Sequence, residues 1–385
     1  MNFELNELQQ MVRETARSFA DAELIPVAAE LDKKGTFPSV QIDKLAELGF
    51  LGMAVPERWG GAGVDQLSYI IAIEEISRGC ASTGVIMSVN NSLVCDPLLR
   101  CGDDEQRDRF LKPLASGERL GCFALSEPAS GSDAAGMRCT AIKDGDHYVI
   151  NGSKNWITNG KEADLCLLFA HHDPSERLRG ISAFIVDRKQ TPYGIGKVEE
   201  KLGIKASSTT SLIFDNIRIP ASQCIGGEGN GFKVALSTLD GGRIGIAAQA
   251  LGIARAAFEE ALAYSRERQA FGSYIGDFGA IQEMLADMAT EIEAARLLIW
   301  RAAVAKQDGE RYGKMAAMAK VYASEMSARV THKALQIHGG YGYVKEFNAE
   351  RHVRDARITE IYEGTSEIQR LVIAREVQKE HAAAG

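Results

Sequence analysis

Three glutamates near the C-terminal end of the chain have a type and spacing that could serve proton transfer. Glu360, Glu363 and Glu367 are three and four residues apart, so one helix face could carry all of them. Only Glu363 is followed by glycine, in Glu363-Gly364-Thr365, which indicates a break in the helix. A carboxylate at such a break could be half-buried, with a pKa raised towards neutrality, as a general base needs. An ordinary acidic helix face has the same composition, and the spacing alone does not choose between the two interpretations.

Two stretches in the middle of the chain could hold a flat, anionic ligand. The segment from Leu125 to Asp133 is small, hydroxylated and turn-forming, so its backbone N–H groups and serine hydroxyls could point at an anion or a heterocycle edge. Trp156, in the segment Asn155 to Gly160, has a broad face on which a ring could rest. The simpler alternatives are an ordinary surface loop and, favoured on this pattern alone, a core tryptophan.

Basic residues could contact an anionic substrate at two places in the C-terminal half. Arg243 stands at the opening of a helix, after Asp240 and two glycines. Arg268 and Phe271 belong to a second basic and aromatic cluster. Taken singly, each is better explained as part of a solvated helix face.

Composition and missing motifs exclude several classes of function. The chain has 385 residues, a net charge of -8 and no basic run, so no nucleic-acid partner is expected. The glycine-rich stretch from Gly226 to Gly231 does not fit a dinucleotide-binding fingerprint, and there is no P-loop. No C-x-x-C or H-E-x-x-H spacing predicts a metal, and the seven cysteines fit free thiols in a reducing compartment. No apolar run is long enough to span a membrane, and the polar N-terminus is no signal or transit peptide.

The residue pattern of the sequence changes twice along the chain, which predicts three domains that position these residues. Residues 1–120 show helical periodicity. Residues 121–225 are short β-branched and aromatic runs separated by turn signals at Asp144-Gly145, Asn151-Gly152 and Asn159-Gly160, which predict an antiparallel β domain. Residues 226–385 carry long helical faces with short glycine-bearing loops, typical of a helix bundle. The predicted class is α+β: an N-terminal helical domain, a central antiparallel β domain and a C-terminal four-helix bundle.

Six segments, taken together and in order, carry a family resemblance. They are Ala124 to Asp133, Trp156 to Gly160, Lys201 to Ile204, Arg268 to Gly272, Gln336 to Gly342 and Arg354 to Thr365. With these segments the chain resembles the acyl-CoA dehydrogenases over essentially its whole length, and most closely the short-chain (butyryl-CoA) type.

The resemblance implies a homotetramer that binds FAD between the β domain and the bundle. It implies that Glu363 removes the α-proton of a short-chain acyl-CoA, that the β-hydrogen passes to the flavin as hydride, and that electrons continue to an electron-transfer flavoprotein. The implied flavin contacts from the β domain are Phe123, Leu125, Ser126, Gly131, Ser132, Trp156, Ile157 and Thr158. Those from the bundle are Thr365 and Glu367, with Arg268, Phe271, Gln336, Gly339 and Gly340 reaching the FAD of a neighbouring subunit. The implied acyl-CoA contacts are Ser132, Asp240, Arg243 and Gly364.

Three departures refine the resemblance. The isovaleryl branch carries its base on the earlier helix, where this chain has Gly242, so the role falls to Glu363. Glutaryl-CoA members carry an Arg-Ser pair where this chain has Gly84-Val85, which disfavours a dicarboxylate substrate. Gly279 stands where short-chain relatives tend to have a glutamine near the FAD, which puts that one contact in doubt.

Other functions remain open on the sequence. The same machinery could act on a branched, cyclic or aromatic acyl-CoA, react with oxygen as an oxidase, or serve as a non-catalytic acyl-CoA or flavin-binding protein. A bacterial cytoplasm is the expected location, or the mitochondrial matrix if the protein is eukaryotic.

Overall fold

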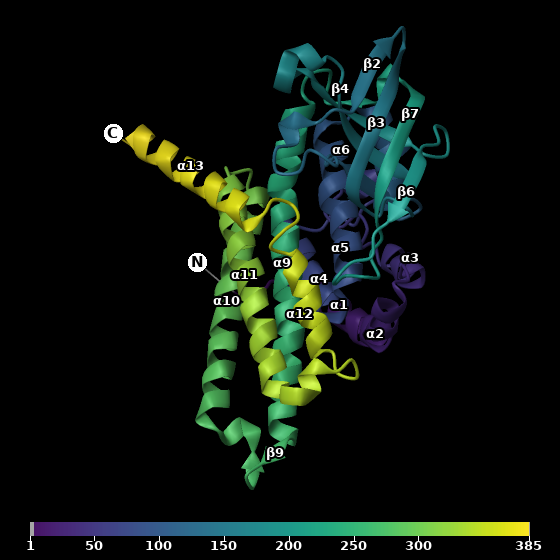
Figure 1. Cartoon of the computed structure of the whole chain (residues 1–385). Helices are drawn as coiled ribbons and strands as arrows, with labels where there is room; N and C mark the ends of the chain where they lie inside the picture. Colours follow the sequence, from purple (N-terminus) through teal and green to yellow (C-terminus); the bar gives the residue numbers. More distant parts are fainter. Residues whose placement is uncertain (1–3, 385) are drawn as a thin grey trace.

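The computed structural model describes residues 4–384, in which a β domain lies against one end of a long helix bundle (Figure 1). N-terminal helices cover the side of the bundle below the β domain (Figure 1). The α+β class predicted from the sequence, with helices, an antiparallel β domain and a C-terminal helical domain in that order, is confirmed.

The N-terminal part is built around one buried helix, α4 (Gln66–Gly79), whose residues from Leu67 onward are all buried. A helix that is buried all round belongs to a protein core, and this one packs with α1 against α9 of the bundle. Arg255 of α9 donates to Glu74 and Glu75 of α4 at 2.7 and 2.8 Å, which ties the two parts together. The remaining helices are α1 (Glu7–Phe19), α2 (Ile25–Lys34), α3 (Ser39–Glu47), α5 (Ala81–Ser88), α6 (Asp96–Cys101), α7 (Asp104–Gln106) and α8 (Lys112–Ala115), with wide π-helical turns η1 (Ala20–Leu24), η3 (Val89–Cys95) and η4 (Arg107–Leu111).

The β domain is one sheet with the order β6-β7-β3-β2-β4-β5-β8, and β1 pairs with β4. Most neighbouring strands are antiparallel, whereas β1 runs parallel to β4. β4 and β5 are buried at every residue, since the sheet is covered on both faces there. The strands are β1 (Gly121–Ala124), β2 (Thr140–Asp144), β3 (His147–Thr158), β4 (Leu165–His171), β5 (Ile181–Asp187), β6 (Gly194–Val198), β7 (Thr209–Pro220) and β8 (Cys224–Ile225).

Of the three turn signals, one closes a hairpin. Asp144-Gly145 joins β2 to β3, with Asp144 opposite His147. The turn predicted at Asn151-Gly152 is wrong, because both residues lie inside β3 at an irregularity in its pairing with β7. A β-carbon at Gly152 would lie 2.8 Å from the Cα of Cys139, so glycine is needed there for a close approach of strands. Asn159-Gly160 does form a turn, but β3 and β4, which flank it, do not pair with each other.

The C-terminal part is a bundle of long helices with a small hairpin at its far end. α9 (Gly231–Glu267) begins under the β domain and runs the length of the bundle beside α10 (Gly279–Gln307) and α11 (Gly313–His338) (Figure 1). The hairpin of β9 (Gln269–Ala270) and β10 (Ser273–Tyr274) follows α9 at the end away from the sheet (Figure 1). α12 (Ala349–Ile358) returns towards the sheet, and α13 (Ser366–Ala384) projects away from the bundle (Figure 1). Between residues 4 and 384, the helices are all too short or too polar to cross a membrane.

The β domain is fixed against the link between α12 and α13. The backbone N–H of Ile204 donates to the Asp355 carboxylate of α12 at 2.5 Å. A β-carbon at Gly203 would lie 2.2 Å from the carbonyl oxygen of Arg354, so the two backbones meet without a side chain between them. Phe123 of β1 and Tyr362 of the link pack against the same apolar cluster. This edge of the sheet therefore faces the segment that carries Glu363.

Candidate active site

Glu363 lies in a strained turn that interrupts the helices near the C-terminus. The turn separates α12, which ends at Ile358, from α13, which begins at Ser366, so the predicted break is confirmed. Glu363 and Gly364 both have positive φ, at 51° and 94°. A residue with a side chain adopts that conformation at a cost on the order of 1 kcal/mol, so the surroundings must hold it.

Two side chains hold the turn by its carbonyl groups. Nε2 of Gln369 donates to the carbonyl oxygens of Glu363 at 3.2 Å and Gly364 at 2.9 Å. Nζ of Lys320, on α11, donates to the same Gly364 oxygen at 2.7 Å. A β-carbon at Gly364 would lie 2.5 Å from Nε2 of Gln369, so the arrangement requires glycine at that position. The backbone of Glu363 is therefore anchored from both α11 and α13.

The Glu363 carboxylate points into the protein although other parts of the residue reach the surface. Its Oε2 atom is buried and has no hydrogen-bond partner among the described residues. A β-carbon at Gly242 of α9 would lie 2.1 Å from this oxygen and 2.7 Å from Cδ2 of Leu93. The carboxylate thus occupies the space that any side chain at position 242 would need. This is a physical reason why position 242 on α9, where the isovaleryl branch carries its base, is glycine in a chain whose base is Glu363.

Burial is the main influence on the ionisation of Glu363. Loss of water raises its pKa to about 7, and the nearby charges of Lys320 and Arg243 act in the opposite direction. Burial lowers the pKa of Lys320 to about 8. A carboxylic acid with a pKa near 7 exchanges a proton readily at neutral pH, as a general base requires.

Arg243 and Asp240 lie one turn apart on α9 beside Glu363. Nη1 of Arg243 donates to Asp240 at 2.5 Å, and Nε of Arg243 is buried without a partner. Arg243 is only 5% exposed, so the solvated helix face considered from the sequence is wrong for this residue. Burial raises the pKa of Asp240. The charge of Arg243 is the strongest influence in the opposite direction and stabilises the Asp240 carboxylate. An unused guanidinium N–H next to the base could donate to an acyl-CoA carbonyl or amide.

The loop from Leu125 to Asp133 is anchored to β3 by a buried ion pair. Nζ of Lys154 lies 2.7 Å from the Glu127 carboxylate and donates to the Leu125 carbonyl at 3.0 Å. The same carboxylate accepts the backbone N–H groups of Arg138 at 2.6 Å and Cys139 at 3.0 Å. Because Lys154 is two residues before Trp156, the pair couples the loop to the strand end that carries the indole. The two stretches identified from the sequence thus form one rigid edge.

The exposed groups at this edge fit a flavin. Trp156 is 60% exposed with φ at 62°, so the interpretation of a core tryptophan is wrong, and its face is free for a ring. Gly131 and Ser132 are exposed, and a β-carbon at Gly131 would meet nothing within 4 Å, which leaves room for a phosphate. Phe123, Ser126 and Thr158 are half-buried, whereas Leu125 and Ile157 are buried and can offer only backbone groups or apolar contact. Thr365 and Glu367, at the start of α13, follow directly after the Glu363 turn.

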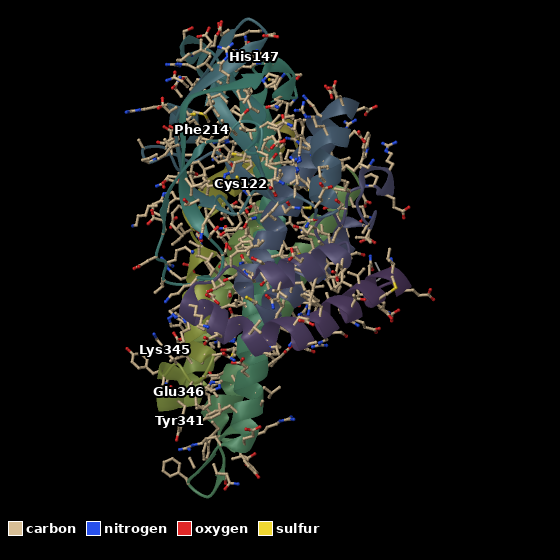
Figure 2. All side chains as sticks on the ribbon, turned by 90° about the vertical axis from the view of Figure 1, so that its right-hand side faces the viewer. Cys122, His147, Phe214, Tyr341, Lys345 and Glu346 are labelled. Carbon is tan, nitrogen blue, oxygen red and sulfur yellow. The ribbon has the colours of Figure 1, made fainter. Side chains whose placement is uncertain are left out.

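A second set of predicted flavin residues lies at the opposite end of the molecule. Arg268 and Phe271 follow α9, Gln336 lies in the last turn of α11, and Gly339 and Gly340 follow that helix. The guanidinium of Arg268 stacks over Tyr341 at 5.6 Å, and Figure 2 shows Tyr341 far from Cys122, which lies in the β domain. The 37 residues of α9 span about 55 Å between the two ends. One chain therefore does not bring this set to the flavin edge, and Phe271 is left 99% exposed.

Several residues that shape the site were not identified from the sequence. Lys154 and Glu127 resembled ordinary polar residues of a strand and a loop. Lys320 does carry a signal, because it stands at a core position of the apolar face that includes Ala316, Ala323 and Ser327. Gln369 carries none, since nothing local distinguishes it from a surface glutamine of α13. Gly279 lies at the open start of α10, where a β-carbon would meet nothing within 4 Å.

Comparisons with known proteins match this chain to acyl-CoA dehydrogenases over almost its whole length. Family models for the N-terminal, middle and C-terminal domains of acyl-CoA dehydrogenase match residues 6–118, 122–217 and 229–378. The mitochondrial short-chain specific acyl-CoA dehydrogenase of Bos taurus is 56% identical over 98% of this chain and 92% of that protein. The butyryl-CoA dehydrogenase structure from Megasphaera elsdenii is 44% identical with a TM-score of 0.97, covering 98% of this chain and 100% of that one. A chain solved in work on the electron transferring flavoprotein of Acidaminococcus fermentans is 48% identical with a TM-score of 0.97, covering 98% and 99%.

Replacing Gly242 with alanine should displace the Glu363 carboxylate. The added methyl group would overlap Oε2, and misplacing a reacting group by about 1 Å can lower a rate on the order of 10²-fold. We therefore expect kcat for the dehydrogenation to fall by that order while bound flavin is retained. Gly241→Ala is the matched control, because its β-carbon would approach the flexible end of Lys306 at 3.1 Å and the Tyr312 hydroxyl at an ordinary contact distance of 3.9 Å. Equal activity of both variants would contradict the claim that the Glu363 carboxylate fills the space beside Gly242.

Replacing Lys154 with methionine should loosen the flavin edge. The Glu127 carboxylate would be left buried without its counter-ion, which costs about 3–5 kcal/mol of stability. We expect a lower melting temperature and several-fold less bound flavin per chain, measured by absorbance. The double variant Lys154→Met/Glu127→Gln should recover part of the melting temperature, and Lys143→Met, whose pair with Glu228 is exposed, should change neither quantity. Full flavin occupancy and an unchanged melting temperature in Lys154→Met would refute this role.

Proposed function

The chain belongs to the acyl-CoA dehydrogenase family, and on that basis we propose that it oxidises a short-chain acyl-CoA to the trans-2-enoyl-CoA with Glu363 as the base. The family membership makes the protein a flavin-dependent oxidoreductase with FAD as its cofactor. The observation that carries the assignment of the base is the enclosed Glu363 carboxylate, whose pKa is about 7 and whose space is left free by Gly242.

The proposed proton transfer follows from the state of the Glu363 carboxylate. The α-proton of a thioester is weakly acidic, so the base must be placed against it and must itself be poorly solvated. The Cα–H bond breaks, its proton goes to Oε2 of Glu363, and its electron pair forms the Cα–Cβ double bond. The β-hydrogen leaves with its own electron pair, which FAD accepts when it is bound. Below a pH of about 7 Glu363 is increasingly protonated, so the rate should fall as the pH is lowered.

The residues of the flavin edge have separate parts in this proposal. Trp156 would stack on the ring system, and the loop from Ser126 to Ser132 would supply hydroxyl and backbone donors. Thr365 and Glu367 would approach from the bundle side, next to the base. Ser132, Asp240, Arg243 and Gly364 would contact the acyl-CoA. The closeness of Arg243, with Asp240 one helical turn away, to the turn of Glu363 and Gly364 supports this part of the proposal.

A homotetramer accounts for the second set of residues. Arg268, Phe271, Gln336, Gly339 and Gly340 lie about one length of α9 from the flavin edge of their own chain, so we propose that they reach the FAD of a neighbouring subunit. The fully exposed ring of Phe271 supports this proposal, since a large apolar side chain gains free energy when a second subunit covers it.

A short-chain substrate is favoured over a dicarboxylate by the surroundings of Gly84. A β-carbon there would lie 2.1 Å from Oγ of Ser77, and Val85 is packed in an apolar cluster with Leu93 and Ile246. An arginine at position 84, which a distal carboxylate would need, does not fit this packing. The names of the bovine and Megasphaera relatives also support a short acyl chain.

We propose an electron-transfer flavoprotein as the acceptor of the electrons. The support is the likeness to the chain solved in work on the Acidaminococcus electron transferring flavoprotein. For location we propose a bacterial cytoplasm, or the mitochondrial matrix if the cell is eukaryotic, and relatives of both origins exist.

Anaerobic mixing with butyryl-CoA should bleach the flavin of the wild-type protein. Glu363→Gln should bind FAD normally but reduce it at least about 10³-fold more slowly, because the amide cannot accept the α-proton. Glu30→Gln is the control, because Glu30 lies on α2, is exposed and pairs with Lys34 at the surface, so it should be dispensable. A panel of straight, branched, cyclic and aromatic acyl-CoA thioesters, assayed by flavin absorbance, separates the substrate classes. Retained absorbance with every short acyl-CoA would reject the proposed function.

A further inference from the structure

A lysine is buried in the bundle next to the base. Lys320 lies in the N-terminal third of α11 and is 0% exposed. A buried ammonium group is costly unless its charge and its three N–H donors are compensated. Its presence at a core position therefore calls for a reason other than packing, since an apolar residue would fill the same space at lower cost.

The contacts of Lys320 anchor the turn that carries Glu363. Its Nζ donates to the carbonyl oxygen of Gly364 at 2.7 Å. Within residues 4–384, Lys320 forms no ion pair with a carboxylate, so its charge is not neutralised by direct contact. Glu363 is the strongest influence that favours its charged form, with weaker ones from Glu360 and Glu367. The cation and the base thus influence each other's ionisation without a direct ion pair.

Other ionisable groups also face Glu363, but they stabilise the charge of its carboxylate less than Lys320 does. Arg243 of α9 also favours the carboxylate form, but it is paired with Asp240 at 2.5 Å, so part of its charge is already balanced. Tyr69 of α4 and Tyr362 next to the base both have pKa values raised by burial, so both are neutral and add no charge at neutral pH. The ionisable groups around the base are therefore Lys320 from α11, Arg243 and Asp240 from α9, Tyr69 from α4, and Glu360, Tyr362 and Glu367 from the link and α13.

We propose that Lys320 is a positioning residue for proton transfer: it fixes the Glu363 turn through the Gly364 carbonyl, and its charge, which no carboxylate contacts directly, favours the ionised form of the Glu363 carboxylate. The proposal rests on the assignment of Glu363 as the base. Lys320 would thus have two roles, a hydrogen bond that holds the turn and a charge that acts on Glu363, whereas a purely structural contact would have only the first. Gln369 provides the comparison, because it donates to the same carbonyl at 2.9 Å without carrying a charge.

The test is the pH dependence of flavin reduction by butyryl-CoA in five variants and the wild type. The wild-type rate should rise with pH through a midpoint near 7, as Glu363 loses its proton. Removing the positive charge favours the protonated acid, so Lys320→Met and Lys320→Gln should move this midpoint up by about one pH unit or more. Lys320→Arg keeps the charge and should return the midpoint to within a few tenths of a unit of the wild type. Gln369→Met should lower kcat and leave the midpoint in place, because it removes only hydrogen bonds.

Bound FAD and melting temperature, measured for every variant, show which of them are folded. Lys333→Met, on the exposed side of the same helix and paired with Asp287, is the control for a lost lysine and should leave both rate and midpoint unchanged. If either folded neutral variant of Lys320 keeps the wild-type midpoint and behaves like Gln369→Met, the electrostatic role is refuted and Lys320 only supports the turn. If the wild-type protein itself does not reduce its flavin with any acyl-CoA, the proposed function fails instead, so the two failures are distinguishable.

Discussion

Exclusion of water from one carboxylate is the constraint on which the rest of the site depends. Oε2 of Glu363 is buried and makes no hydrogen bond with the described residues. A rise in its pKa from 4.5 to about 7 corresponds to roughly 3 kcal/mol of lost stabilisation of the charged form. The fold must supply that free energy elsewhere, together with the strain of two successive residues at positive φ. Such a carboxylate is a stronger base than one in water, and that is the property that removal of an α-proton requires.

The architecture can be understood as the means of keeping this carboxylate in place. α9 leaves space for it at Gly242, and α4, fixed to α9 by Arg255, supports that wall from behind. α11 and α13 hold the turn through Lys320 and Gln369. The β domain is fixed to α12 at Gly203 and Ile204, so the flavin edge and the base share one rigid frame. The N-terminal helices, the β domain and the C-terminal bundle therefore each contribute to the surroundings of the site, and none of them forms the site alone.

The sequence predicted what depends on local pattern and missed what depends on long-range packing. The order of helical and β parts follows from periodicity, and the break before α13 follows from Gly364, so both could be predicted. The Asn151-Gly152 turn was wrong because a glycine forced by the close approach of Cys139 looks the same as a turn glycine. The favoured interpretations of Arg243 as solvated and Trp156 as buried were both wrong, because burial depends on helices and strands far away in sequence. Lys320 carried a signal in its core position on α11, but the contacts of Lys320 and Gln369 could not be predicted, because their partner is a backbone carbonyl, which has no signature in the sequence.

Proton removal by Glu363 can be measured apart from the redox step by using acetyl-CoA, which has α-hydrogens but no β-carbon. The FAD-loaded protein is incubated with acetyl-CoA in deuterium oxide, and mass spectrometry follows deuterium entering the acetyl methyl group. Our account predicts that the wild-type protein catalyses this exchange and that Glu363→Gln does so at least about 10²-fold more slowly. Equal exchange rates in the two proteins would contradict the claim that the enclosed Glu363 carboxylate takes the α-proton.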